Sequence, residues 1–246
     1  MIRNLKALGL ALVAVFALSA VAATAASAQG KLTSDGPVTL KGGEIVSGND
    51  ILKALGIEVK CPGSTVTAHA YNTTPHGLIS SGATTLTVTP LYKQTDALGK
   101  INCKAAGLPT TVDMNGCDYV VHIGATTGVA DTYSGTIDIV CPVGSEITLT
   151  VFTTEADDPS KPFCILHIKA QTGLTGATAV DTTKGSIELK GTVTGIHVTR
   201  TNVSKTTHLV LCPDGTTTAT GSFIVQDLIT GVNSLGNATT IGLTHP

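Results

Sequence analysis

Apolar and polar residues alternate in short segments along most of the chain after residue 56. The segment ITLTVF at 147–152 shows the pattern, and Gly, Pro, Asn, Asp and Thr fill the gaps between such segments. Because side chains of a β-strand point alternately to its two faces, the alternation predicts strands that each bury one face. The predicted strands are an edge strand at 38–40 and the segments 57–60, 65–70, 85–92, 118–123, 136–140, 147–152, 164–170, 186–199, 208–211, 217–225 and 238–243.

The stretch from Cys117 to Cys141 is the clearest hairpin, because two alternating segments flank a middle rich in Gly and Thr. Folding it about that middle opposes three pairs: Cys117 with Cys141, Tyr119 with Ile139, and Val121 with Ile137. A slip of one residue would turn Ile137 and Ile139 toward water, so burial fixes this register. We therefore predict a disulfide between Cys117 and Cys141.

Two local features interrupt the strand pattern. The stretch SGNDILKALG at 47–56 has capping residues near its start, apolar residues on one helical side and a glycine at its end. These signals predict one short helix near residues 49–55. Within 186–199 the apolar residues occupy odd-numbered positions up to Val193 and even-numbered positions after Gly195. This shift by one position at Gly195 predicts a β-bulge.

Residues 131–139, DTYSGTIDI, are similar to residues 181–189, DTTKGSIEL, and each segment follows a strand led by a cysteine. The similarity indicates an internal hairpin duplication, 117–141 and 164–191, within one all-β domain spanning residues 29–246. Chance similarity in a chain rich in Thr, Gly and Ile is the alternative.

Residues 1–28 have the pattern of a secretory signal peptide. Arg3 and Lys6 precede an apolar segment at 8–21, and the sequence ASA at 26–28 predicts cleavage before Gln29. The apolar segment is short for a bilayer span, so we expect no transmembrane segment after cleavage. The prediction is a secreted protein, free or associated with the cell envelope.

Removal of residues 1–28 leaves 13 of the 15 basic residues and all 17 acidic residues, a formal charge of −4. With Arg200 as its only remaining arginine, the mature chain is a poor match for a phosphate backbone, and we expect no nucleic-acid partner. Charged residues make up 13% of the chain, aromatic residues 3%, and tryptophan is absent. This composition favours a β-sandwich whose outer faces are coated with threonine.

All six cysteines follow residue 28, and an even number in an oxidising compartment predicts three disulfides. Beyond the hairpin, we expect Cys61 to bond Cys103 and Cys164 to bond Cys212, because these links are sequential and unentangled. A structural metal site is the rival interpretation, but no C-x-x-C pair or close Cys/His cluster supports it.

Few residues suggest chemistry, and none of the common catalytic motifs is present. His122 and His167 both face outward on their predicted strands and could bind a metal with Asp138. Asp138 and Glu188 occupy matching places in the repeated segments and could form a carboxylate pair of the glycosidase type. Solvated surface residues are the competing interpretation of all four, and we expect no catalytic, cofactor or metal site.

The loop residues 155–158 include Glu155, Asp157 and Asp158, which could hold calcium weakly or form a solvated acidic turn.

The segments NGCDYVVH at 115–122 and CPVGSEITLTVF at 141–152 resemble uncharacterised exported cysteine-containing proteins of actinobacteria. The resemblance covers most of the mature chain and implies a Gram-positive secreted setting. It carries over no assigned chemistry.

We therefore expect an all-β fold, an antiparallel two-sheet sandwich of hairpins stapled by disulfides. The expected function is a non-enzymatic binding or structural module with an extracellular or cell-wall partner. A secreted hydrolase with a dispersed catalytic site is the alternative, and a pocket in which histidine contacts Asp, Glu or Ser would favour it.

Overall fold

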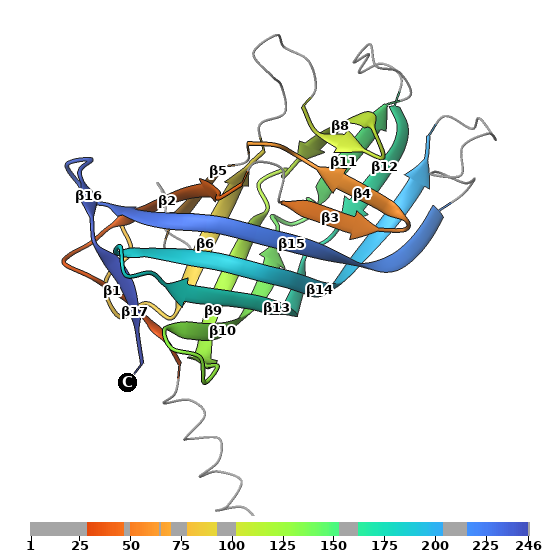
Figure 1. Cartoon of the computed structure of the whole chain (residues 1–246). Helices are drawn as coiled ribbons and strands as arrows, with labels where there is room; N and C mark the ends of the chain where they lie inside the picture. Colours follow the sequence, from red (N-terminus) through yellow and green to blue (C-terminus); the bar gives the residue numbers. More distant parts are fainter. Residues whose placement is uncertain are drawn as a thin grey trace, which may run out of the picture.

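The computed structural model describes residues 29–46, 50–63, 65–69, 78–92, 102–152, 162–203 and 216–245 (Figure 1). All regular structure in these residues is β, and every strand pairing is antiparallel. The all-β prediction is thus confirmed. The predicted signal peptide, the predicted strand at 208–211 and the acidic loop residues 155–158 lie outside the described residues.

Eight strands close on themselves to form a first ring, in which each strand is hydrogen-bonded to two neighbours. In ring order they are β2 (Thr39–Glu44), β5 (Thr65–His69), β6 (Thr85–Leu91), β9 (Asp118–Thr126), β10 (Thr132–Val140), β13 (Gln171–Asp181), β14 (Ser186–Asn202) and β15 (Thr216–Val232). The pairing of β15 with β2 closes the ring.

A second ring of eight strands shares β14 and β15 with the first. Its other members, in ring order, are β3 (Ile51–Ala54), β4 (Ile57–Lys60), β7 (Lys104–Ala105), β8 (Leu108–Asp113), β11 (Ile147–Phe152) and β12 (Pro162–Ile168). The pairing of β12 with β14 and that of β3 with β15 close this ring.

The shared β14–β15 ribbon joins the two rings end to end. Its strands are 17 residues each, and β14 pairs with β13 in its first half and with β12 in its second. Likewise β15 pairs with β3 at 222–224 and with β2 at 227–232. Figure 1 shows the ribbon running along the molecule, with β6, β9 and β10 toward one end and β8, β11 and β12 toward the other.

The expected sandwich of two separate sheets is replaced by one continuous sheet that closes twice. Closure pairs strands that would otherwise be sheet edges, where free N–H and C=O groups invite aggregation. The segment predicted as an edge strand at 38–40 illustrates the difference, because β2 lies between β15 and β5.

The helix predicted near residues 49–55 is wrong, because β3 and β4 form a hairpin there. Leu52, Ala54 and Val59 are buried in the alternating pattern of strands. The two turn residues Leu55 and Gly56 have φ values of 54° and 75°, the positive angles that a type I′ hairpin turn requires. Pairing of β3 with both β4 and β15 provides hydrogen-bond partners for its backbone N–H and C=O groups. A helix of one or two turns is only marginally stable by itself.

The bulge predicted at Gly195 is confirmed. The β14–β15 register shifts between Thr194 and Ile196, and Gly195 has a φ of 88°. The extra residue lets Val193 and Ile196 both point inward, so the ribbon keeps one buried face across the junction of the rings.

The predicted register of the β9–β10 hairpin is also confirmed, with Tyr119 opposite Ile139 and Val121 opposite Ile137. Cys117 and Cys141 form a disulfide at the open end of this hairpin.

The second predicted disulfide, Cys61–Cys103, is confirmed as well. Cys164 is disulfide-bonded, and its predicted partner Cys212 lies outside the described residues.

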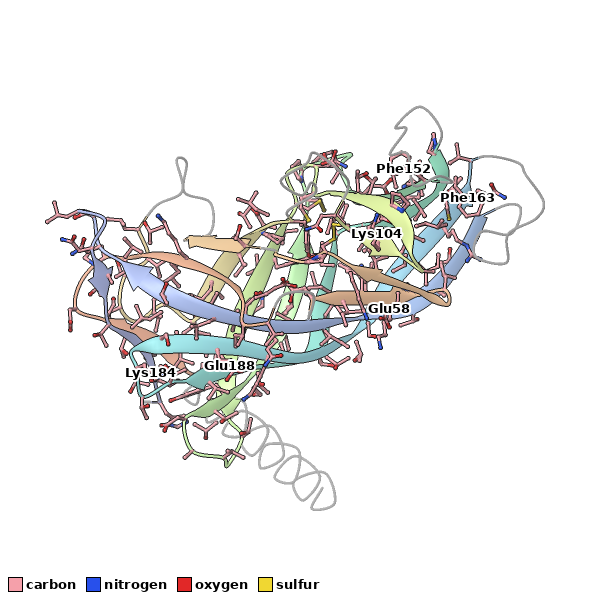
Figure 2. All side chains as sticks on the ribbon, turned by 45° about the horizontal axis from the view of Figure 1, so that its top comes forward. Glu58, Lys104, Phe152, Phe163, Lys184 and Glu188 are labelled. Atoms are coloured by element: carbon pink, nitrogen blue, oxygen red, sulfur yellow. A yellow bond between two sulfur atoms is a disulfide. The ribbon has the colours of Figure 1, made fainter. Side chains whose placement is uncertain are left out.

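The interior contains two apolar clusters, one in the first ring and one that extends from the second ring to Ile139 and Leu174 of the first. Tyr119 and Ile137 pack against both clusters. A separate two-stranded sheet of β1 (Lys31–Ser34) and β17 (Ile241–Thr244) contributes apolar residues to the first cluster. The short strand β16 (Ala238–Thr239) pairs with the end of β15. In Figure 2, Phe152 and Phe163 mark the second-ring end of the molecule, and Lys184 and Glu188 lie toward the first.

The two segments of the predicted duplication are arranged differently. Residues 117–141 form one hairpin, whereas 164–191 span β12, β13 and the start of β14. In the second segment, residues 187–191 pair with β13, and β12 pairs with the far half of β14. The duplication stays a prediction.

The double substitution Cys117→Ala/Cys141→Ala should lower the free energy of unfolding by about 3 kcal/mol, because it frees a loop spanning 24 residues in the unfolded chain. Urea unfolding without reductant measures this loss. Val143→Ala, an exposed change beside the same hairpin, is the control and should stay within about 0.5 kcal/mol. A loss below about 1 kcal/mol for the cysteine pair would contradict a stabilising role.

Candidate functional site

A cavity of about 70 Å³ lies inside the molecule where the two rings meet. Strands of both rings line it, including β6, β9 and β10 from the first and β3, β4, β8, β11 and β12 from the second. The shared ribbon contributes Leu189, Val193, Phe223 and Val225 to its wall. Most of the described lining is aliphatic, and no histidine, lysine or arginine belongs to it.

Two carboxylates and two phenols are the ionisable groups in this apolar wall: Asp50, Asp227, Tyr92 and Tyr119. Both aspartates are 4% exposed, which is unusual for a residue that is normally charged. The tyrosines are partly buried, and their hydroxyl oxygens are 3.5 Å apart, at the upper limit of a hydrogen bond.

Strand parity places Asp227 inside the molecule. It lies opposite Leu189 in the ribbon and shares its face of β15 with Val225 and Ile229, all of them buried. Its Oδ1 atom has no hydrogen-bond partner among the described residues. A buried polar atom of this kind is costly, so it marks a position where a ligand or water would be stabilised.

Asp50 is held at the start of β3 by contacts of its backbone. Its N–H donates to Glu44 Oε1 at 3.0 Å, and Glu44 Oε2 accepts from the N–H of Gly63 at 2.7 Å. The Asn102 side chain donates to Pro62 O at 2.8 Å, and the Cys61–Cys103 disulfide lies next to this contact. These links fix the Asp50 side of the cavity.

Burial raises the pKa of Asp227 to about 7, and the negative charges of Asp50 and Glu44 add to the effect. Burial likewise raises the pKa of Tyr119 to about 12, while the hydrogen bond with Tyr92 lowers it and the Asp50 charge raises it. Burial first, and the neighbouring Tyr119 next, place the pKa of Tyr92 well above its ordinary value. The cavity therefore favours protonated groups, as a low-dielectric and negatively charged environment should.

The structure separates the two histidines that a metal site with Asp138 would need. His122 Nε2 lies 2.9 Å from Asp138 Oδ2, while His167 Nδ1 lies 2.6 Å from Glu146 Oε1 on a different part of the sheet. Within the described ranges, no group of three His, Cys, Asp or Glu side chains could hold a metal ion.

Asp138 and Glu188, the carboxylates of the glycosidase alternative, also have separate partners. Asp138 Oδ1 accepts from the N–H of Gly173 at 2.7 Å, besides the contact with His122. Glu188 instead pairs with Lys190 of its own strand at 3.3 Å. Each carboxylate thus has partners of its own. The contacts of Asp138 link neighbouring strands, and the contact of Glu188 lies at the surface.

Sequence reasoning missed the cavity residues. In FIVQDLIT, the parity of Phe223, Val225 and Ile229 already places Asp227 on the core face, which is a readable signal. Asp50 was interpreted as a helix cap, and Tyr92 as the end of a strand. Their convergence depends on the closure of both rings, which local patterns do not reveal.

Comparisons with protein-family models, with curated proteins and with solved structures find no match for this chain. In the part of the chain that the structure describes, no helix has the length and hydrophobicity to cross a membrane. Fold and site together define a doubly closed antiparallel sheet with an acidic cavity at its centre.

The raised pKa of Asp227 makes stability depend on pH. Between about pH 4 and pH 7 the folded protein holds a proton that the unfolded chain has released, so unfolding free energy falls as pH rises through this window. The contribution of this proton to the free energy of unfolding is complete below the pKa that the aspartate has in the unfolded chain, and it is lost above the pKa of Asp227 in the folded protein. It totals up to about 4 kcal/mol, at about 1.4 kcal/mol per pKa unit.

Asp227→Asn should remove this slope, because the amide stays neutral. Urea unfolding at pH 4, 5.5 and 7 measures it, with the exposed Asp35→Asn as the control that keeps the slope of the unchanged protein. If the free energy of unfolding depends on pH in the same way in the unchanged protein and in Asp227→Asn, the prediction of a raised pKa for Asp227 is wrong.

Asp138→Ala should destabilise the protein by about 1 kcal/mol, because it removes a charge-assisted hydrogen bond to the N–H of Gly173 that links β10 to β13. Glu188→Ala should cost less than about 0.5 kcal/mol, since its ion pair is exposed on the Lys190 side. Thermal and urea unfolding of the two variants compare them directly. Equal losses would contradict the different roles assigned to the two carboxylates.

Proposed function

We propose that this protein is an exported, non-enzymatic binding module and that the cavity between its rings is the ligand site. The observation that carries the proposal is the combination of an aliphatic wall with a few convergent polar groups, the usual composition of small-molecule sites. Export is inferred from the signal sequence at 1–28, and the two disulfides are compatible with an oxidising compartment.

Pre-organisation supports the assignment. Closed sheets leave few ways for the wall to collapse, and the Cys61–Cys103 and Cys117–Cys141 disulfides fasten the ends of β4 and of the β9–β10 hairpin, which line the cavity. A site that is already formed loses little conformational entropy when a ligand binds.

The cavity volume limits the ligand. Since a single water needs roughly 10–15 Å³ by this kind of measure, a cavity of about 70 Å³ accepts a molecule of about four to six non-hydrogen atoms. Such a ligand can gain at most about 1.5 kcal/mol per atom, so binding in the micromolar to millimolar range is expected.

The alternative of a secreted hydrolase has one observation in its favour, the two histidine–carboxylate pairs. His122 with Asp138 could act as a general base, as such pairs do in hydrolytic triads. Hydrolysis of a panel of soluble esters and glycosides, lost in His122→Ala, would support this second candidate.

Small alkyl compounds of four to six non-hydrogen atoms, whether cationic, neutral or anionic, test the binding proposal. At least one class should shift the NMR signals of cavity residues such as Val193 and Leu189 at millimolar concentration. Val225→Phe should abolish these shifts, because the larger side chain fills the space.

Val129→Phe is the matched control, since Val129 is 65% exposed and remote from the cavity wall. Thermal unfolding verifies that Val225→Phe is folded, and Val193→Leu is a smaller filling substitution if it is not. Absence of cavity shifts with all three classes would overturn the proposed function.

A further inference from the structure

We propose that the cavity binds small primary ammonium ions, with Asp227 as the group that holds the charged head. This inference rests on the proposed function and names its ligand class. It starts from the sign of the charge, since the described lining contains two carboxylates and no basic side chain.

Burial turns this charge pattern into selectivity. Asp227 is 4% exposed and lies within reach of the negative charge of Asp50, so its ionised form is unfavourable without a positive charge beside it. An anionic ligand would add to the repulsion, and a neutral one would leave it unrelieved. A monovalent cation relieves it.

Hydrogen-bonding capacity points to an ammonium group in particular. Asp227 Oδ1 is buried, lines the cavity and has no hydrogen-bond partner among the described residues. The Tyr92 and Tyr119 hydroxyls provide further acceptor oxygens on the same wall. A primary ammonium has three N–H donors, enough for the Asp227 carboxylate and both phenols.

The apolar wall suits the remainder of such a ligand. Leu189, Val193 and Val225 offer aliphatic contacts, and Phe223, whose ring centre is 6.2 Å from that of Tyr119, adds an aromatic face for a cation. A hard divalent ion would instead need six or more oxygen ligands, which this mainly aliphatic lining does not supply. An alkylammonium of three to five carbons fits both charge and volume.

Proton and ammonium compete for the same carboxylate. The groups that face Asp227 are Asp50 and Glu44, with Tyr92 beside them, and all of them favour a bound positive charge. Because the pKa of Asp227 is raised, ammonium affinity should increase by at least tenfold from pH 5 to pH 8. The affinity of a neutral ligand of the same shape should change less than threefold.

The test compares n-butylammonium with 1-butanol, which has the same number of non-hydrogen atoms, by NMR titration of the mature protein at pH 8. Butylammonium should bind at least tenfold more tightly than butanol, and Asp227→Asn should reduce this ratio at least tenfold. Asp35→Asn, an exposed change of the same type, should leave the ratio unchanged. Butyrate and MgCl₂ are added as anionic and divalent probes.

Binding of butanol as tight as that of butylammonium, or an unchanged ratio in Asp227→Asn, would overturn the ammonium assignment and leave the proposed binding function standing. Tighter binding of butyrate or Mg²⁺ would overturn it as well. Absence of binding by every probe would overturn both the ammonium assignment and the proposed binding function. If Asp227→Asn does not fold, the ratio of butylammonium affinity to butanol affinity is measured against pH in the unchanged protein. A ratio that does not change with pH contradicts the proposal.

Discussion

The antiparallel pairing of β14 with β15 is the interaction on which the rest of the structure depends. Fifteen opposed residue pairs join these strands, and each ring closes only through them. The bulge at Gly195 lets the ribbon continue from one ring into the other with its apolar side facing inward throughout. Weakening this ribbon would open both rings together and expose strand edges on each.

The ribbon also sets the position of the acidic cavity. Asp227 reaches the interior because it shares a face of β15 with Val225, and β3 brings Asp50 nearby by pairing with the same strand three to five residues earlier. Burying two carboxylates opposes folding, so the apolar clusters and the disulfides must offset that cost. Proteins commonly accept such a cost where a polar group has a function.

Local pattern was enough to predict the strands of the β9–β10 hairpin, its register, the Cys117–Cys141 disulfide and the Gly195 bulge, because each depends on residues close in sequence or on strict alternation. The Cys61–Cys103 disulfide, with a sequence separation of 42, followed instead from pairing the remaining cysteines in sequential order. Local pattern failed at 51–54, where the two-residue turn that follows resembles a helix end. It also missed β13, whose inward residues are mainly Leu174 and alanines and so give weak alternation. Ring closure, and with it the cavity, arises from pairings between distant strands that no local signal specifies.

The most direct test of an acidic cavity at the ring junction is a ¹³C NMR titration of the aspartate side-chain carboxyl carbons in the chain from residue 29 to residue 246. The structure predicts that the Asp227 signal, assigned by its loss in Asp227→Asn, titrates near neutral pH, since its pKa is raised to about 7. Titration of Asp227 near pH 4, as for an exposed aspartate, would contradict the buried cavity and the ligand site derived from it.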